Sequence, residues 1–281
     1  MTPPGLRRIL VAVDGSPHGE AAVTLGIDWA RRFGAELLGL GILDEPSITR
    51  PEPVPPGASA YKVARDRARL RDAHQHIVGF LAAFHRRCAE AKVRAATVED
   101  VGRPHQQILE EALRCDVVVL GRETHFKFET QAQPDETVGQ VLRQSSRPVV
   151  VVPRDPAPGQ GVLVAYGEGR EVARTLQTFV LLDLAGGETI ELLAVHRDQA
   201  ETERRLQRPA AFLAAHGLPH RLCPVGAHAA PAEVILEEVQ RRRPRLIVMG
   251  AQGHHPVRDL FASSVTRAVL KETPAPVFVG A

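Results

Sequence analysis

The feature that most constrains this 281-residue chain is an internal repeat. Short segments of the first half recur in the second half in the same order. The pairs are VAVDGS (11–16) with VAYGEG (164–169), FLAA (80–83 and 212–215), ILEE (108–111 and 235–238), VVVLG (117–121) with LIVMG (246–250), and PVVVV (148–152) with PVFVG (276–280). A single match would carry little weight, but a whole series in register predicts a tandem duplication.

The repeat also places the domain boundaries. A linker rich in Pro and Gly, PRDPAPGQG (153–161), separates the halves, and we expect domains at 1–154 and 161–281. Asp14 and Gly121 are 107 positions apart, whereas their counterparts Gly167 and Gly250 are 83 apart. The first half therefore carries extra residues. Much of this excess fits the Pro-rich insertion at 44–59, which cannot be regular structure throughout.

Each half alternates apolar runs of strand length with amphipathic helical stretches. In the first half we expect strands at 7–13, 36–43, 93–98, 116–121 and 148–153, and helices at 17–33, 61–91, 105–113 and about 136–146. Such alternation predicts right-handed βαβ units, and the Val/Ile/Leu-rich strands fit burial on both faces. The fold class is therefore α/β, with two tandem Rossmann-like domains. Each is a five-stranded, parallel, doubly wound sheet with helices on both faces, whose ligands bind beyond the carboxyl ends of the strands.

Charge and composition exclude several function classes. The formal net charge is +2, which argues against a nucleic-acid or anionic-membrane partner. The arginine run 241–243 lies where a helix should end, and there it complements the helix dipole. No secretory leader and no membrane-spanning stretch is apparent, so we expect a cytoplasmic protein. Cys88, Cys115 and Cys223 are isolated, lack metal-binding spacing, and are expected to be buried small residues.

The segment GAQGHHPVRDLFASSV (250–265) is the strongest candidate for a binding site. Gly250 ends the predicted fourth strand of the second half and Gly253 follows three residues later. Ser263 and Ser264 then begin a helix. Glycines let the backbone approach a ligand, and a helix N-terminus offers unpaired N–H groups with partial positive charge. The same residues would also serve in an ordinary strand-to-helix turn with a serine cap, so both interpretations remain open.

With these motifs the chain resembles the universal stress protein family (UspA-like), in its tandem two-domain form. The VAVDGS opening, ILDEP (42–46) and PVVVVP (148–153) are typical of that family. Its nucleotide-binding members carry G-x2-G-x9-G-[ST], which is kept here except that Ser263 replaces the third glycine. The resemblance implies ATP binding, with Mg²⁺ as a further candidate ligand. It implies a nucleotide site in the second half comprising Val195, Gly250, Gly253, Ser263, Ser264 and Val265.

The two halves differ in the residues that this resemblance assigns to the nucleotide. The first-half equivalents are Asp14, Ile42, Gly121, Thr137 and Val138. Asp14 stands where relatives place a carboxylate by the adenosine, and Gly167 replaces it in the second half. Conversely, Thr124 replaces the second glycine of the first-half loop, and Glu136 would repel an incoming phosphate. We therefore expect nucleotide in the second half and none bound in the usual manner in the first.

We find no catalytic or metal-binding motif, and at most slow ATP hydrolysis is expected. Asp259 alone is thin support for a metal site, and the loop and turn histidines are interpreted as surface residues: His105, His228, His254 and His255. Two hypotheses remain, a nucleotide-responsive stress protein and a non-nucleotide scaffold or interaction module. In either case PVVVV and PVFVG are expected to pair within the chain as an internal pseudo-dimer. A homodimer is a further possibility.

Overall fold

The computed structural model describes residues 5–126, 136–167, 169–251 and 264–280. The elements of the first half are β1 (Arg8–Ala12), α1 (Pro17–Phe33), β2 (Glu36–Leu43), α2 (Glu45–Ile48), α3 (Ser59–Glu90), β3 (Ala95–Val101), α4 (Pro104–Ala112), β4 (Val117–Gly121), α5 (Thr137–Gln144) and β5 (Val149–Val152). Those of the second half are β6 (Val162–Ala165), α6 (Arg170–Leu181), β7 (Ile190–His196), α7 (Gln199–Ala215), β8 (His220–Gly226), α8 (Pro231–Arg242), β9 (Leu246–Gly250), α9 (Ser264–Glu272) and β10 (Val277–Gly280).

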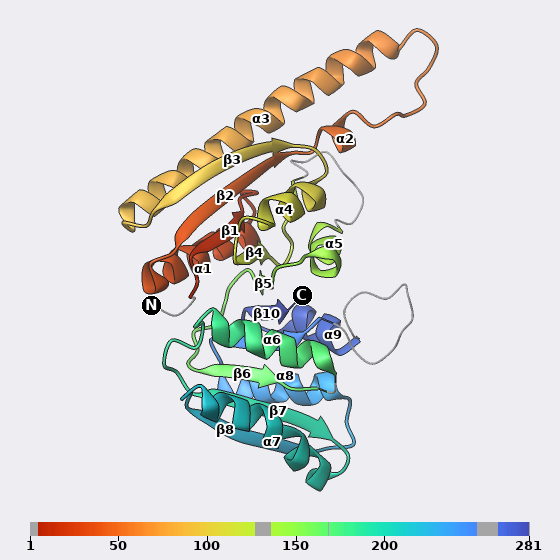
Figure 1. Cartoon of the computed structure of the whole chain (residues 1–281). Coiled ribbons are helices and arrows are strands. Elements are labelled where there is room, and N and C mark those ends of the chain that lie inside the picture. The colour runs from red at the N-terminus through yellow and green to blue at the C-terminus, as the bar shows by residue number, and fades with distance from the viewer. Residues whose placement is uncertain (1–4, 127–135, 168, 252–263, 281) are drawn as a thin grey trace.

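All these strands belong to one sheet, in the order β3-β2-β1-β4-β5-β10-β9-β6-β7-β8 (Figure 1). Within each half every neighbouring pair is parallel and the strand order is the same, which confirms the predicted fold class. The halves meet where β5 and β10 pair antiparallel, with Val150 opposite Phe278. These are the segments PVVVV and PVFVG, so the last strands of the two halves pair within the chain. A sheet edge that would otherwise be exposed is thereby covered.

The strands are buried on both faces because their side chains alternate between two layers of helices. Ile9 and Val11 face a core that also receives α1, α3, α6 and α7, and this core runs through both halves. Leu10 faces a second core, under α4 and α5. A third core lies under α8 and α9 in the second half. At the seam, Phe179 of α6 meets Phe278 edge-on, with ring centroids 5.7 Å apart.

The first helix shows how local sequence sets an element's limits. Ser16 is the N-cap of α1, where its side chain accepts a hydrogen bond from the Gly19 N–H, and Pro17 occupies the first helical position. At the other end Gly34 takes φ 68°, a left-handed conformation that glycine adopts without strain. The observed limits of α1 and β2 coincide with the predicted ranges.

The extra residues of the first half are divided between two elements. Within the Pro-rich insertion the structure forms α2, and residues 49–58 adopt neither helix nor strand. The remainder lengthens α3, which has 32 residues against 17 in its counterpart α7. The end of α3 nearest this insertion extends beyond the sheet in Figure 1. Asp66 is buried there and forms ion pairs with Lys62 and Arg65, and Arg65 also contacts Glu52 of the insertion.

Candidate functional site

The crevice of the first half lies where β1 and β4 end side by side. Asp14 follows β1 and is only 4% exposed. Its carboxylate accepts hydrogen bonds from the Ser16 N–H at 3.0 Å, the Ser16 hydroxyl at 2.9 Å and the His125 N–H at 2.8 Å. The last of these bonds ties the loop after β4 to the end of β1. The Asp14 carboxylate is thus already engaged by three donors of the protein itself.

Burial raises the pKa of Asp14 above its ordinary value, because the charged carboxylate loses hydration. The hydrogen bonds from His125 and Ser16 act in the opposite direction and partly offset this penalty. The balance leaves a buried acid whose proton is held more tightly in the folded protein than in the unfolded chain. The Asp14 carboxyl group is therefore a buried acceptor that holds Ser16 and His125 in place.

The loop after β4 fills the first crevice with side chains. Thr124 and Phe126 are each 1% exposed, and Phe126 packs into the core under α4 and α5. The ring of Phe80, from α3, lies so close to Gly15 that a Cβ there would collide with it. The Thr124 hydroxyl is buried without a hydrogen-bond partner among the described residues. These contacts close the crevice from two sides.

The other first-half residues assigned by sequence serve packing. A Cβ at Gly121 would lie 2.5 Å from the carbonyl carbon of His18, so α1 approaches this strand end only because residue 121 is glycine. Ile42 is fully buried in the core under α4 and α5. Thr137 is buried at the first position of α5, and Val138 packs against the same core.

The corresponding positions of the second half are less crowded. A Cβ at Gly167 would meet no atom within 4 Å in the described part of the chain. A Cβ at Gly250 would lie 3.2 Å from the nearest atom, the Val172 nitrogen of α6. Val195 and Val265 are partly buried and pack against the core under α8 and α9. Small residues thus border the crevice between β6 and β9.

The described part of the phosphate-loop candidate is its end in α9. Ser264 is the first residue of α9 and is exposed. Two residues on, the Thr266 hydroxyl donates a hydrogen bond of 3.1 Å to the carbonyl of Gly250, which fixes the start of α9 against the end of β9. Gly253, His254, His255, Asp259 and Ser263 lie outside the described residues, and their roles stay predictions.

One residue that the sequence analysis missed connects the end of β4 to the C-terminal end of α9. Arg122 directly follows Gly121, and its guanidinium donates hydrogen bonds to the carbonyls of Lys271, at 2.8 Å, and Thr273. These carbonyls lie at the C-terminal end of α9, where a cation is favourable. Burial lowers the pKa of Arg122, although the neighbouring Glu123 opposes that effect. No signal in the sequence pairs residues so far apart.

The remaining candidates behave as ordinary structural or surface groups. His228 is exposed and His105 is half-buried. The three cysteines are buried and form no disulfide, as predicted. Burial raises the pKa of both Cys88 and Cys115 to about 11, which suppresses thiolate reactivity.

In the described ranges no three His, Cys, Asp or Glu side chains gather as a metal site. None of the helices there is both long and apolar enough to cross a bilayer.

The fold and crevices define a class of protein: a tandem α/β chain of two Rossmann-like domains with crevices at the carboxyl ends of their strands. The family model described as the universal stress protein family matches residues 5–153 and again 162–279. The chain therefore belongs to the universal stress protein family, with two copies of its domain.

Two solved structures that match nearly the whole chain agree with it in fold. A universal stress protein from Archaeoglobus fulgidus DSM 4304 is 18% identical, with a TM-score of 0.69, and the match covers 97% of each chain. A functionally unknown protein from Pseudomonas aeruginosa PAO1 is 15% identical, with a TM-score of 0.56, over 98% of this chain and 92% of that one. A universal stress protein solved in complex with cAMP is 20% identical, with a TM-score of 0.35, and covers 53% of this chain and 98% of its own. Among curated proteins, none matches the sequence.

Proposed function

We propose that this universal stress protein binds ATP or a related adenine nucleotide in its second domain, residues 161–281, and acts in the cytoplasm as a nucleotide-responsive regulator of the stress response. The first domain, residues 1–154, is the partner that senses the state of the second. The proposal assigns no catalytic residue, and ATP serves as a conformational ligand with at most slow hydrolysis.

The observation that carries the proposal is the contrast between the two crevices. In the first, Asp14 is bonded to the loop at His125, and Phe126 is packed into the core. In the second, Gly167 leaves room beside the end of β6, as far as the described residues extend, and Gly250 is less closely approached than Gly121. The G-x2-G-x9-S-S pattern stands in this second half, whereas the first half has Thr124 and Glu136 at the equivalent positions.

The orientation of α9 supports phosphate binding at that crevice. Its N-terminus, at the exposed Ser264, lies beside the end of β9 through the Thr266–Gly250 hydrogen bond. In general the N–H groups at a helix N-terminus, together with the helix dipole, favour an anion. A loss of the Asp14-type carboxylate in the second half costs a hydrogen-bonding group, on the order of 1 kcal/mol, which weakens binding without abolishing it.

The same helix offers a route by which the first domain would respond. Arg122 holds the C-terminal end of α9, while the N-terminal end faces the proposed phosphate site. Leu270 of α9 also packs against the core under α4 and α5, in the first half. A nucleotide that shifts or stiffens α9 would therefore change contacts in both domains, which is the requirement for coupling between sites.

The proposal is tested by ligand analysis and by two variants. Mass spectrometry of small molecules released from denatured, freshly purified protein should detect ATP or ADP. Gly253→Asp should abolish binding of Mg-ATP, because it places a carboxylate where phosphate is expected, whereas Asp14→Ala should leave the affinity almost unchanged. Thermal unfolding of each variant, followed in parallel, separates lost binding from lost folding. Loss of binding in Asp14→Ala alone would show that we assigned the nucleotide to the wrong half.

The second candidate function is a scaffold that binds no nucleotide. The closed first crevice and the continuous sheet through β5 and β10 support it, because a scaffold needs its two halves held together rather than an open ligand site. Absence of co-purified nucleotide, together with no thermal shift on addition of Mg-ATP, would select this function. The mass of the protein in solution would show whether two such chains associate.

A further inference from the structure

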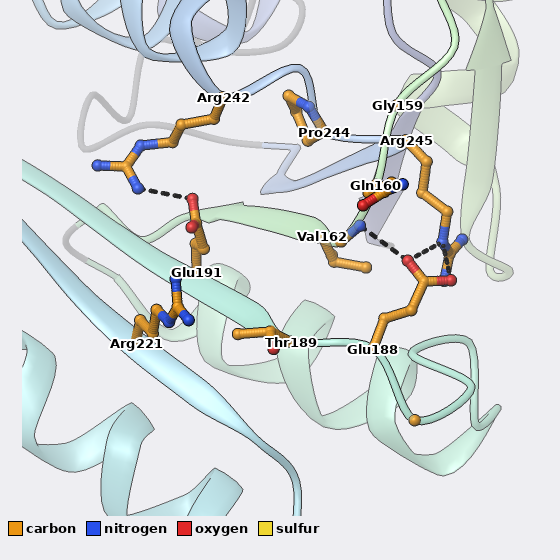
Figure 2. Close-up of a pocket in the computed structure, with 12 residues that line it drawn as sticks. Gly159, Gln160, Val162, Glu188, Thr189, Glu191, Arg221, Arg242, Pro244 and Arg245 are labelled. Carbon is orange, nitrogen blue, oxygen red and sulfur yellow. Dashed lines mark hydrogen bonds and ion pairs between the residues drawn. The ribbon is translucent and has the colours of Figure 1, made fainter.

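A groove of about 500 Å³ lies at the amino ends of β6, β7 and β8 (Figure 2). The proposed nucleotide crevice lies at the opposite, carboxyl ends of the strands. Its walls include Gly161, Thr189, Glu191, Arg221, Arg242 and Arg245. Binding pockets for small molecules commonly have volumes of roughly 300–1,000 Å³. The groove belongs to neither the proposed nucleotide site nor the seam between β5 and β10.

Comparison with the first half shows why the groove exists. Ile9 pairs with Leu37 in the first half as Val162 pairs with Ile190 in the second, so Gly161 and Thr189 stand in the places of Arg8 and Glu36. In the first half those two side chains fill the edge with an ion pair of 2.6 Å. In the second half the smaller residues leave the space open.

The inner wall of the groove has changed from apolar to charged. By the same strand register, Glu191 and Arg221 of the second half occupy the places of Leu38 and Ala96. Leu38 is 3% exposed and belongs to the first-half core. The equivalent ILEE segments likewise put Arg242 in the place of the buried Cys115. Charged residues cost free energy at such positions unless they are paired or exposed to water, so the amino end of these strands has exchanged apolar contacts for polar ones.

Two of the three arginines are already neutralised. Arg242 forms ion pairs with Glu191 at 2.7 Å and Glu238 at 2.5 Å. Arg245 pairs with Glu188 at 2.7 Å and also donates to the carbonyl of Leu184 at 2.8 Å. These bonds hold both guanidinium groups in fixed positions along the wall. The third arginine is therefore the one whose positive charge remains unpaired within the described part of the groove.

Arg221 is that third arginine. It is exposed, and among the described residues it takes part in no hydrogen bond or ion pair. In Figure 2 its side chain rises from β8 towards Glu191, into the groove. Arg221, Arg242 and Arg245 outnumber Glu188 and Glu191, and Glu188 is also paired with Arg32 at 2.9 Å. The groove thus has net positive charge and one guanidinium available to a ligand.

We propose that this groove is a second binding site, which takes a small ligand through a carboxylate or phosphate group held by Arg221. The planar guanidinium offers two parallel N–H donors that match such an oxyanion. Thr189, just before the neighbouring strand β7, lines the same groove and adds a hydroxyl donor. The site is independent of the nucleotide crevice, and the two would be occupied separately.

The test uses the full chain with inorganic phosphate and succinate as separate probes. Calorimetry, together with the amide chemical shifts of Gln160 and Thr189, should show saturable binding of at least one probe, with a Kd on the order of 1 mM for so small a ligand. Phosphate alone assigns the ligand to phosphorylated compounds, and succinate alone to carboxylates. Binding of neither probe overturns the proposal.

Four variants locate the binding. Arg221→Gln should weaken it about tenfold or more, since a charge-assisted pair is lost. Thr189→Glu, which copies the first-half residue Glu36, should abolish it by filling the groove and offering Arg221 an internal partner. Arg67→Gln, at an exposed arginine of α3, is the matched control and should change nothing. If Ser264→Ala removes the binding while Arg221→Gln does not, the probe occupies the nucleotide crevice and the proposal fails.

Discussion

The two halves share a strand order but differ in what occupies the carboxyl ends of their strands. The first half closes its crevice with the segment Thr124–Phe126, which is tied to Asp14 at one end and packed into the core at the other. The second half keeps glycines at 167 and 250 and a helix that begins with exposed Ser264. The amino ends of the strands also differ between the halves. The Arg8–Glu36 ion pair occupies this end in the first half, whereas the second half has a groove there. Duplication preserved the sheet, while loop and edge residues diverged to close one domain and open the other.

The largest expected effect tests whether the first crevice is closed by packing. Phe126→Ala should lower the free energy of unfolding by about 3–5 kcal/mol, because a fully buried aromatic side chain is replaced by a cavity. Urea unfolding measures the change. Phe126→Leu, which keeps most of the volume, is the control and should lose much less. A loss below about 1 kcal/mol in Phe126→Ala would mean that the loop does not pack in this way.

The next prediction compares the glycines that end β4 and β9. Gly121→Ala should lower the free energy of unfolding by about 1–3 kcal/mol, because its Cβ would meet the backbone of His18 and displace the first turn of α1. Gly250→Ala places its Cβ at the longer distance of 3.2 Å from Val172 and should cost less than about 1 kcal/mol. Thermal or urea unfolding ranks the pair. Equal losses would contradict the difference between the two strand ends.

A third prediction concerns the contact between the halves. Arg122→Met should destabilise the protein by about 1–2 kcal/mol, because the carbonyls of Lys271 and Thr273 lose a charged donor. Its counterpart in the second half is Ala251, which cannot make such a bond, so this contact is made from the first half only. Hydrogen exchange of α9 amides should increase in the variant. The exposed Arg86→Met serves as the control, and unchanged exchange in α9 would argue against this role of Arg122.

The last prediction is a pH dependence that arises from Asp14, for which the second half has Gly167 and therefore no equivalent group. Burial raises the pKa of Asp14 above 3.8, so the folded state binds its proton more tightly than the unfolded chain does. The resulting stability is fully present below the unfolded pKa and is lost as the pH rises through the folded pKa. Each pH unit between these two values corresponds to about 1.4 kcal/mol.

Asp14→Asn removes this titration. The difference in unfolding free energy, wild type minus variant, should therefore fall as the pH rises through the acidic range and then become constant. Urea unfolding at a series of pH values measures the slope. A difference that rises with pH would mean that the hydrogen bonds from Ser16 and His125 outweigh burial.

The sequence was sufficient for features that depend on local or periodic patterns. Ser16, Pro17 and Gly34 mark both ends of α1, and the apolar runs mark the buried strands. The excess residues of the first half were located only in part, because a helix can lengthen without any punctuation in the sequence. That explains why α3 begins at Ser59, within the region expected to be an insertion.

The sequence by itself determined the duplication, the α/β class and the family, because strands buried on both faces and a repeated motif order leave their pattern in the residues. Only the tertiary structure decided that Arg122 holds the end of α9 and that Gly161 and Thr189 open a groove. Each of these depends on residues that are distant in the chain, and a single sequence does not record which of its distant residues meet.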